Sequence, residues 1–183
     1  MEFQERHIEF LFIDRNDCER CSGTEDHLLA AIDQAREELA TRGITTTLDT
    51  VHVTDAATAS ARRLLSSPTV RVDGRDIAGA LIESVCAADG CTCGDGTAID
   101  CRMWEWNGRT YEVPPVEMLV ERIIEPMGPI VAERDYRLPG NLVRYFATDD
   151  SDACCAPAVA ATCCAPSDKA ECCGEDGDAC SCK

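Results

Sequence analysis

The order of apolar and polar residues predicts that the chain opens with a buried strand that leads into a helix. Residues 7 to 14 form an almost continuous apolar run, which is typical of a central strand covered on both faces. Apolar residues then recur at helical spacing as far as Thr41, and Gly43 supplies the stop signal. Asp17 and Thr24 are the two candidates for the residue that caps the start of this helix.

A second strand and a second helix follow. Ile44 to Val53 is rich in β-branched residues and predicts a strand. Thr54-Asp55 offers a cap for a helix that reaches Leu65, and Ser66-Ser67-Pro68 then breaks the helical pattern. The order up to this point is therefore β-α-β-α.

The rest of the pattern predicts a third strand, a hairpin and two more helices. Thr69 to Val72 is the third strand, and a short helical pattern follows from Ala78. Asn107-Gly108 lies between two strand patterns and is a strong hairpin signal. A helix with a clear apolar stripe starts after Pro114-Pro115, and a short final helix is predicted near Asn141 to Phe146.

Cys18 and Cys21 lie where the first strand ends and the first helix begins. A thiol in the first turn of a helix is close to unpaired N–H groups and to the positive end of the helix dipole, both of which favour the thiolate. The same spacing occurs in zinc sites, but a strand before it and a helix after it favour a redox or soft-metal pair. In the redox interpretation Cys18 is the more exposed thiol and attacks, and Cys21 resolves.

A second group of cysteines lies in an insert over residues 78–101. Its members are Cys86, Cys91, Cys93 and Cys101. Their spacing is not a common zinc spacing. Three alternatives stay open for this group: a bound soft metal, disulfide chemistry with the Cys18 pair, and inert thiols.

A third group of cysteines forms a repeat at the end of the chain, where vicinal pairs recur every nine residues. The members are Cys154, Cys155, Cys163, Cys164, Cys172, Cys173, Cys180 and Cys182. The residues between them are small, acidic, Pro or Gly, so we expect residues 148–183 to form a disordered tail behind a domain over residues 1–147. Thiolates without histidine ligands favour As(III), Cu(I), Zn or Hg(II).

Charge and composition narrow the function classes. The net charge is −17, and the acidic residues are spread along the whole chain. This resembles the surfaces of halophilic proteins and makes nucleic acid and anionic membranes unfavourable partners. The N-terminus has no basic region, and the apolar run after it is too short for a signal peptide or a membrane span. We therefore expect a cytoplasmic protein whose thiols are held reduced, and not a secreted disulfide scaffold.

The order of elements and motifs resembles the thioredoxin-like superfamily. Within it, Cys18-x-x-Cys21-x-x-Thr24, the segment from Ser67 to Ile77 and the segment from Tyr136 to Leu142 resemble a thioredoxin-like family of prokaryotic proteins known as a domain of unknown function. The resemblance covers about residues 7 to 147 and implies an α/β fold of the order β-α-β-α-β-hairpin-α. It also implies a cis-proline at Pro68 beside Cys18, as a third residue of the site, whereas an ordinary trans proline is the alternative.

A thioredoxin-like core followed by vicinal cysteine pairs is similar to the arsenite metallochaperones of arsenic-resistance operons, which pass the metalloid to an efflux ATPase. Those chaperones use a vicinal pair and a third cysteine near the N-terminus, where this chain has Cys18 and Cys21 alone. The leading hypothesis is therefore binding or relay of soft metal or metalloid ions by this pair and the tail. The alternatives are a thiol-disulfide oxidoreductase that acts on a disulfide-bearing protein, and a structural zinc protein with an interaction tail.

Overall fold

The computed structural model describes residues 4–14, 18–85, 99–130 and 136–147. By its internal contacts the chain divides into two units, residues 1–145 and residues 146–183. Cys86, Cys91 and Cys93 of the insert lie outside the described residues, and so do the tail over residues 148–183 and its eight cysteines. The predictions made for these segments therefore stay predictions.

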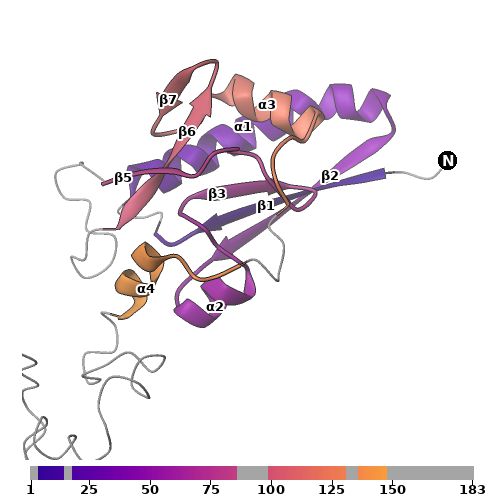
Figure 1. The fold of residues 1–183 in the computed structure, drawn as a ribbon. Coiled ribbons are helices and arrows are strands. Elements are labelled where there is room, and N and C mark those ends of the chain that lie inside the picture. Colours follow the sequence, from indigo (N-terminus) through magenta and orange to yellow (C-terminus); the bar gives the residue numbers. More distant parts are fainter. Residues whose placement is uncertain (1–3, 15–17, 86–98, 131–135, 148–183) are drawn as a thin grey trace, which may run out of the picture. The chain divides into compact units, whose positions relative to one another are not determined.

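A four-stranded mixed sheet forms the centre of the first unit (Figure 1). Its strands are β1 (Gln4–Phe12), β2 (Ile44–His52), β3 (Thr69–Val72) and β4 (Arg75–Asp76), in the order β2-β1-β3-β4. β2 runs parallel to β1, whereas β3 runs antiparallel to β1 and β4 antiparallel to β3. The strand order places β1 inside the sheet, between β2 and β3.

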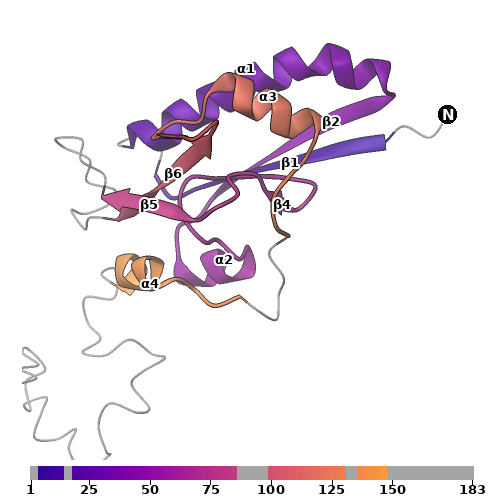
Figure 2. The same ribbon diagram turned by 45° about the horizontal axis from the view of Figure 1, so that its top comes forward.

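The predicted burial of the first strand is confirmed. The side chains of Ile8, Phe10, Leu11 and Phe12 are all buried. Successive residues of a strand point to opposite faces, so both faces of β1 are covered. Helices α1 (Glu19–Thr41) and α3 (Val116–Ile124) lie together on one side of the sheet, and α2 (Ala56–Ala61) lies on the other side (Figures 1 and 2).

The ends of the first two helices differ in part from the predictions. α1 ends at Thr41 as predicted, but its N-cap is Cys18, so the predictions of Asp17 and Thr24 as the cap are wrong. Thr24 lies inside α1, where its hydroxyl donates to the carbonyl oxygen of Arg20 at 2.6 Å. The predicted cap of α2 is confirmed, because the Asp55 carboxylate accepts the N–H of Thr58 at 2.7 Å.

α2 is shorter than predicted: it ends at Ala61 and not at Leu65. Arg63 has a φ of 50°, in the left-handed region, and a residue in that conformation cannot continue a right-handed helix. Residues 62–68 therefore form an irregular connection to β3.

A second sheet contains β5 (Ile82–Val85), β6 (Asp100–Trp106) and β7 (Arg109–Tyr111) in that order. The helical pattern predicted from Ala78 is wrong, because this part of the chain pairs antiparallel with β6 and becomes β5. Pairing with a distant strand overrides local helix preference here. The hairpin predicted at Asn107-Gly108 is confirmed, and both residues have positive φ values of 51° and 72°.

The last two predicted helices are present. α3 starts directly after Pro115 and buries Met118, Leu119 and Ile123. α4 (Gly140–Ala147) covers the segment predicted for the final helix. The described residues thus form a mixed α/β fold with four helices, and none of these helices has the length and apolar character needed to cross a membrane.

Candidate dithiol site

The two cysteines of the motif lie together at the start of α1. Cys18 is the N-cap residue, with extended backbone angles of −112° and 101°, and its carbonyl oxygen accepts the N–H of Cys21 at 3.1 Å. The exposed fractions are 1% for Cys18 and 2% for Cys21. The prediction of a more exposed Cys18 is therefore wrong. Positions three apart lie on one side of a helix, and here that side faces the protein interior.

The surroundings of the Cys21 sulfur disfavour its ionisation. A side-chain hydrogen bond with Cys18 makes the largest contribution to raising the pKa of Cys21 far above its usual range. Burial and the charge of Cys18 raise this pKa further. The Ser67 hydroxyl and the backbone of Asp14 oppose this shift. The raised pKa keeps Cys21 in its protonated thiol form, because burial and the nearby charge of Cys18 both oppose its ionisation.

The loop before β3 supplies the third side chain of the site. The peptide bond between Ser67 and Pro68 is cis, which confirms the conformation expected from the resemblance. The Oγ of Ser67 lies 3.5 Å from the Sγ of Cys21. Pro68 is the residue that the sequence predicts for this site; Ser67 is not among the predicted site residues, although its position directly before the proline is a usable signal. A catalytic role of Pro68 stays a prediction.

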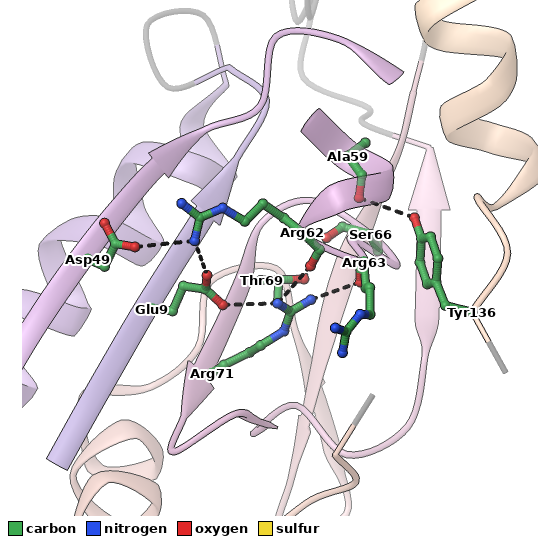
Figure 3. A network of polar contacts seen from close by, with 9 residues as sticks. All are labelled: Glu9, Asp49, Ala59, Arg62, Arg63, Ser66, Thr69, Arg71 and Tyr136. Carbon is green, nitrogen blue, oxygen red and sulfur yellow. Dashed lines mark hydrogen bonds and ion pairs between the residues drawn. The ribbon is translucent and has the colours of Figure 1, made fainter. Parts of the chain in front are cut away.

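A network of ion pairs and hydrogen bonds holds the connection between α2 and β3 (Figure 3). Arg71 of β3 donates to the carbonyl oxygens of Arg62 and Arg63, both at 2.8 Å, and to the Glu9 carboxylate at 2.9 Å. Arg62 in turn contacts Glu9 at 2.9 Å and Asp49 at 3.4 Å. The network fixes the end of α2 to β1 and β2.

Further hydrogen bonds continue along this connection toward the thiols. The Tyr136 hydroxyl donates to the carbonyl oxygen of Leu64 at 2.9 Å, and the Thr69 hydroxyl donates to that of Ser66 at 2.6 Å. The carbonyl oxygen of Ser67 accepts the N–H of Arg102 at 2.8 Å. Satisfied backbone groups on both sides of Ser67 hold its hydroxyl in place.

Arg20, which lies between the two cysteines in the sequence, is buried and joins the start of α1 to the second sheet. Its guanidinium contacts the Glu112 carboxylate at 2.5 Å, the Ser84 hydroxyl at 3.0 Å and the carbonyl oxygens of Val85 and Cys101, each at 3.5 Å. Ser84 and Val85 end β5, and Cys101 lies near the start of β6. Arg20 therefore fixes the cysteine motif against the strands on either side of residues 86–98.

Cys101 is the remaining cysteine that the structure describes. It is buried, and its thiol lies 3.9 Å from the carbonyl oxygen of Ile99. Within residues 4–14, 18–85, 99–130 and 136–147, no three His, Cys, Asp or Glu side chains form a group that could hold a metal ion. In this part of the chain, the structure brings together Cys18, Cys21 and Ser67. Two adjacent thiols can form a disulfide, or offer two thiolates to a soft ion.

A family model described as "Domain of unknown function (DUF2703)" matches residues 7–123. The match covers more than half of the 183 residues and includes Cys18, Cys21, Ser67 and Pro68. No curated protein and no solved structure matches the chain.

Proposed function

The chain belongs to the DUF2703 family, and from this premise we propose that it is a thiol protein whose Cys18/Cys21 pair cycles between a dithiol and a disulfide. The observation that carries the proposal is that Cys18 and Cys21 lie buried at the start of α1, where the Cys18 carbonyl oxygen accepts the N–H of Cys21 at 3.1 Å. This turn places the two cysteines that the disulfide joins on one side of the helix. We assign Cys18 as the attacking thiol, because the raised pKa of Cys21 keeps that thiol protonated, and Cys21 as the resolving one.

The proposed reaction is exchange with a disulfide R–S–S–R. The Cys18 thiolate attacks one of its sulfurs, the S–S bond breaks, and one RS⁻ leaves, so that Cys18 is held in a mixed disulfide. Cys21 then loses its proton and attacks the sulfur of Cys18, which releases the second RS⁻. The two RS⁻ groups take up the two protons of the dithiol, and the disulfide substrate receives two electrons.

We propose further that the fold is thioredoxin-like. The sheet order β2-β1-β3-β4, with β2 parallel and β3 antiparallel to β1, supports this proposal. So does the place of the cysteine pair at the start of α1, directly after β1. Open α/β sheets bind their ligands beyond the carboxyl ends of their strands, which is where this pair lies.

Redox titration of the full chain tests the proposed function. At increasing ratios of oxidised to reduced glutathione, Cys18 and Cys21 are expected to become oxidised together with one midpoint. Trypsin cleaves after Arg15 and Arg20, so the two residues can be followed on separate peptides in a chain with fourteen cysteines. Thiols are alkylated with a light reagent and, after reduction, with a heavy one. Different midpoints for the two peptides, or no oxidation of either, would contradict the proposal.

Capture of soft ions is a second candidate function, and the cysteine repeat of residues 154–173 favours it. Three vicinal pairs at intervals of nine residues each offer two thiolates to one ion. The burial of Cys18 and Cys21 is also compatible with a small cargo. We propose As(III), Cu(I), Zn or Hg(II) as this cargo, with an efflux ATPase as the recipient of As(III).

Replacing the six cysteines of these three vicinal pairs by serine is expected to lower the number of ions bound per chain. The glutathione midpoint of Cys18 and Cys21 should stay unchanged, because sites that share no partner contribute independently. Native mass spectrometry of the reduced chain with arsenite, and separately with Cu(I), measures the stoichiometry. An unchanged stoichiometry in the variant, or less than one ion per wild-type chain, would rule out capture by the tail.

A further inference from the structure

We propose that the Ser67 hydroxyl is a positioning group that stabilises the dithiol form of the Cys18/Cys21 pair over its disulfide form. The inference rests on the redox function proposed above. It starts from the distance of 3.5 Å between the Oγ of Ser67 and the Sγ of Cys21, which connects residues that are 46 positions apart. Ser67 would thus help to set the reduction potential of the pair.

The hydrogen bonds of Ser67 orient its hydroxyl toward this role. A serine hydroxyl has one donor and two acceptor positions. The N–H of Ile13 donates to the Oγ of Ser67 at 3.1 Å and occupies one acceptor position. The O–H group and the second acceptor position are left for Cys21. The hydroxyl can therefore accept from the Cys21 thiol or donate to the Cys21 thiolate.

Oxidation to the disulfide removes the proton or the negative charge of Cys21 on which this hydrogen bond depends. In the dithiol form, Cys21 carries either one proton, for which the side chains of Cys18 and Ser67 are both acceptors, or a negative charge that accepts strongly. In the disulfide form it has neither, and its sulfur is a weak acceptor. The contact with Ser67 is therefore stronger in the dithiol, and a group that stabilises the reduced form makes the pair a stronger oxidant.

The position of Ser67 is determined by its surroundings and not by Cys21. Its carbonyl oxygen is held by the N–H of Arg102, and the preceding carbonyl oxygen is held by the Thr69 hydroxyl. Arg71 holds the start of the same connection (Figure 3). A hydroxyl fixed in this way needs no reorganisation when the state of the sulfur changes.

The neighbouring Ser66 offers a matched control. Both serine side chains are buried. The Oγ of Ser66, however, has no hydrogen-bond partner among the residues that the structure describes. Ser66→Ala thus removes a buried hydroxyl from the same loop without removing a contact to Cys21.

The test is the glutathione midpoint of the full chain, read on the two tryptic peptides. Ser67→Ala is expected to shift the equilibrium about tenfold toward the disulfide, which corresponds to a potential about 30 mV more negative for a two-electron couple. Ser66→Ala should leave the midpoint unchanged. Ser67→Thr, which keeps a hydroxyl, should restore most of the wild-type value.

Stability is measured separately, because Ser67→Ala also removes the acceptor of the Ile13 N–H. If the alanine variant does not fold, the test compares Ser67→Thr with Ser67→Val, because these side chains have similar shapes and differ in the hydroxyl. The midpoint of Ser67→Val is expected to be more negative than that of Ser67→Thr. Equal midpoints for Ser67→Ala and wild type would overturn the role of Ser67 without touching the proposed function. A shift of the midpoint in Ser66→Ala as large as that in Ser67→Ala would do the same. A wild-type chain in which Cys18 and Cys21 form no disulfide would overturn the proposed function and this inference together.

Discussion

Replacing Cys18 by serine is expected to reduce catalysed disulfide exchange to the uncatalysed background. Cys18 is the proposed attacking thiol, and the buried Cys21, whose pKa is raised, has no second thiol within the motif to complete an exchange after Cys18 is lost. Cys21→Ser should behave differently, because the first attack is retained and a mixed disulfide accumulates at Cys18. Reduction of oxidised glutathione by the full chain, followed by mass spectrometry of the tryptic peptide that contains Cys18, measures both outcomes.

Cys101→Ser is the matched control for this experiment. Cys101 is as deeply buried as Cys18, and its thiol points to the carbonyl oxygen of Ile99. Turnover by this variant is expected to equal that of the wild type. Wild-type turnover in Cys18→Ser, or loss of turnover in Cys101→Ser, would show that the attacking thiol is assigned wrongly.

Replacing Asp76 by alanine is expected to destabilise the protein by about 3–5 kcal/mol, the range for breaking a buried ion pair on one side. The Asp76 carboxylate accepts from the Arg102 guanidinium at 2.5 Å, and the side chains are only 3% and 2% exposed. Alanine leaves the arginine charge buried without its partner. The pair also connects β4 to β6, and hence the first sheet to the second. Urea unfolding of the reduced protein at constant salt concentration measures the change in the free energy of unfolding.

Two further variants separate the ion pair from a general effect of mutation. Asp33→Ala removes one partner of the Arg36–Asp33 pair, whose side chains are 69% and 70% exposed, and it should change stability by no more than about 0.5 kcal/mol. The double variant Asp76→Leu with Arg102→Met removes both buried charges and should recover most of the loss. Equal effects of Asp76→Ala and Asp33→Ala would mean that the buried pair has no special importance.

Local patterns were sufficient for several elements of the fold. The end of α1 at Thr41, the Asp55 cap of α2 and the turn at Asn107-Gly108 agree with the structure. Each depends on residues within one turn or one helix end, where chain geometry restricts the choices. The buried run of β1 agrees as well, since an uninterrupted apolar strand needs cover on both faces.

Errors arose where distant parts of the chain compete with a local preference. The segment after Ala78 has a helical pattern, but hydrogen bonds to β6 make it a strand. The left-handed Arg63 ends α2 before its apolar pattern ends, and carbonyl oxygens near that end are held by Arg71 from β3. In both cases the deciding hydrogen bonds come from another element of the fold.

The sequence by itself determined where the thiols lie along the chain: a pair of cysteines at a strand-to-helix junction, and further thiols in the insert and the tail. The tertiary structure decided which groups surround that pair. It buries Cys18, brings Ser67 to Cys21 across 46 positions, and joins Arg20 to Glu112 across 92. Such contacts depend on how the sheets and loops pack in three dimensions, and no spacing rule along the chain encodes them.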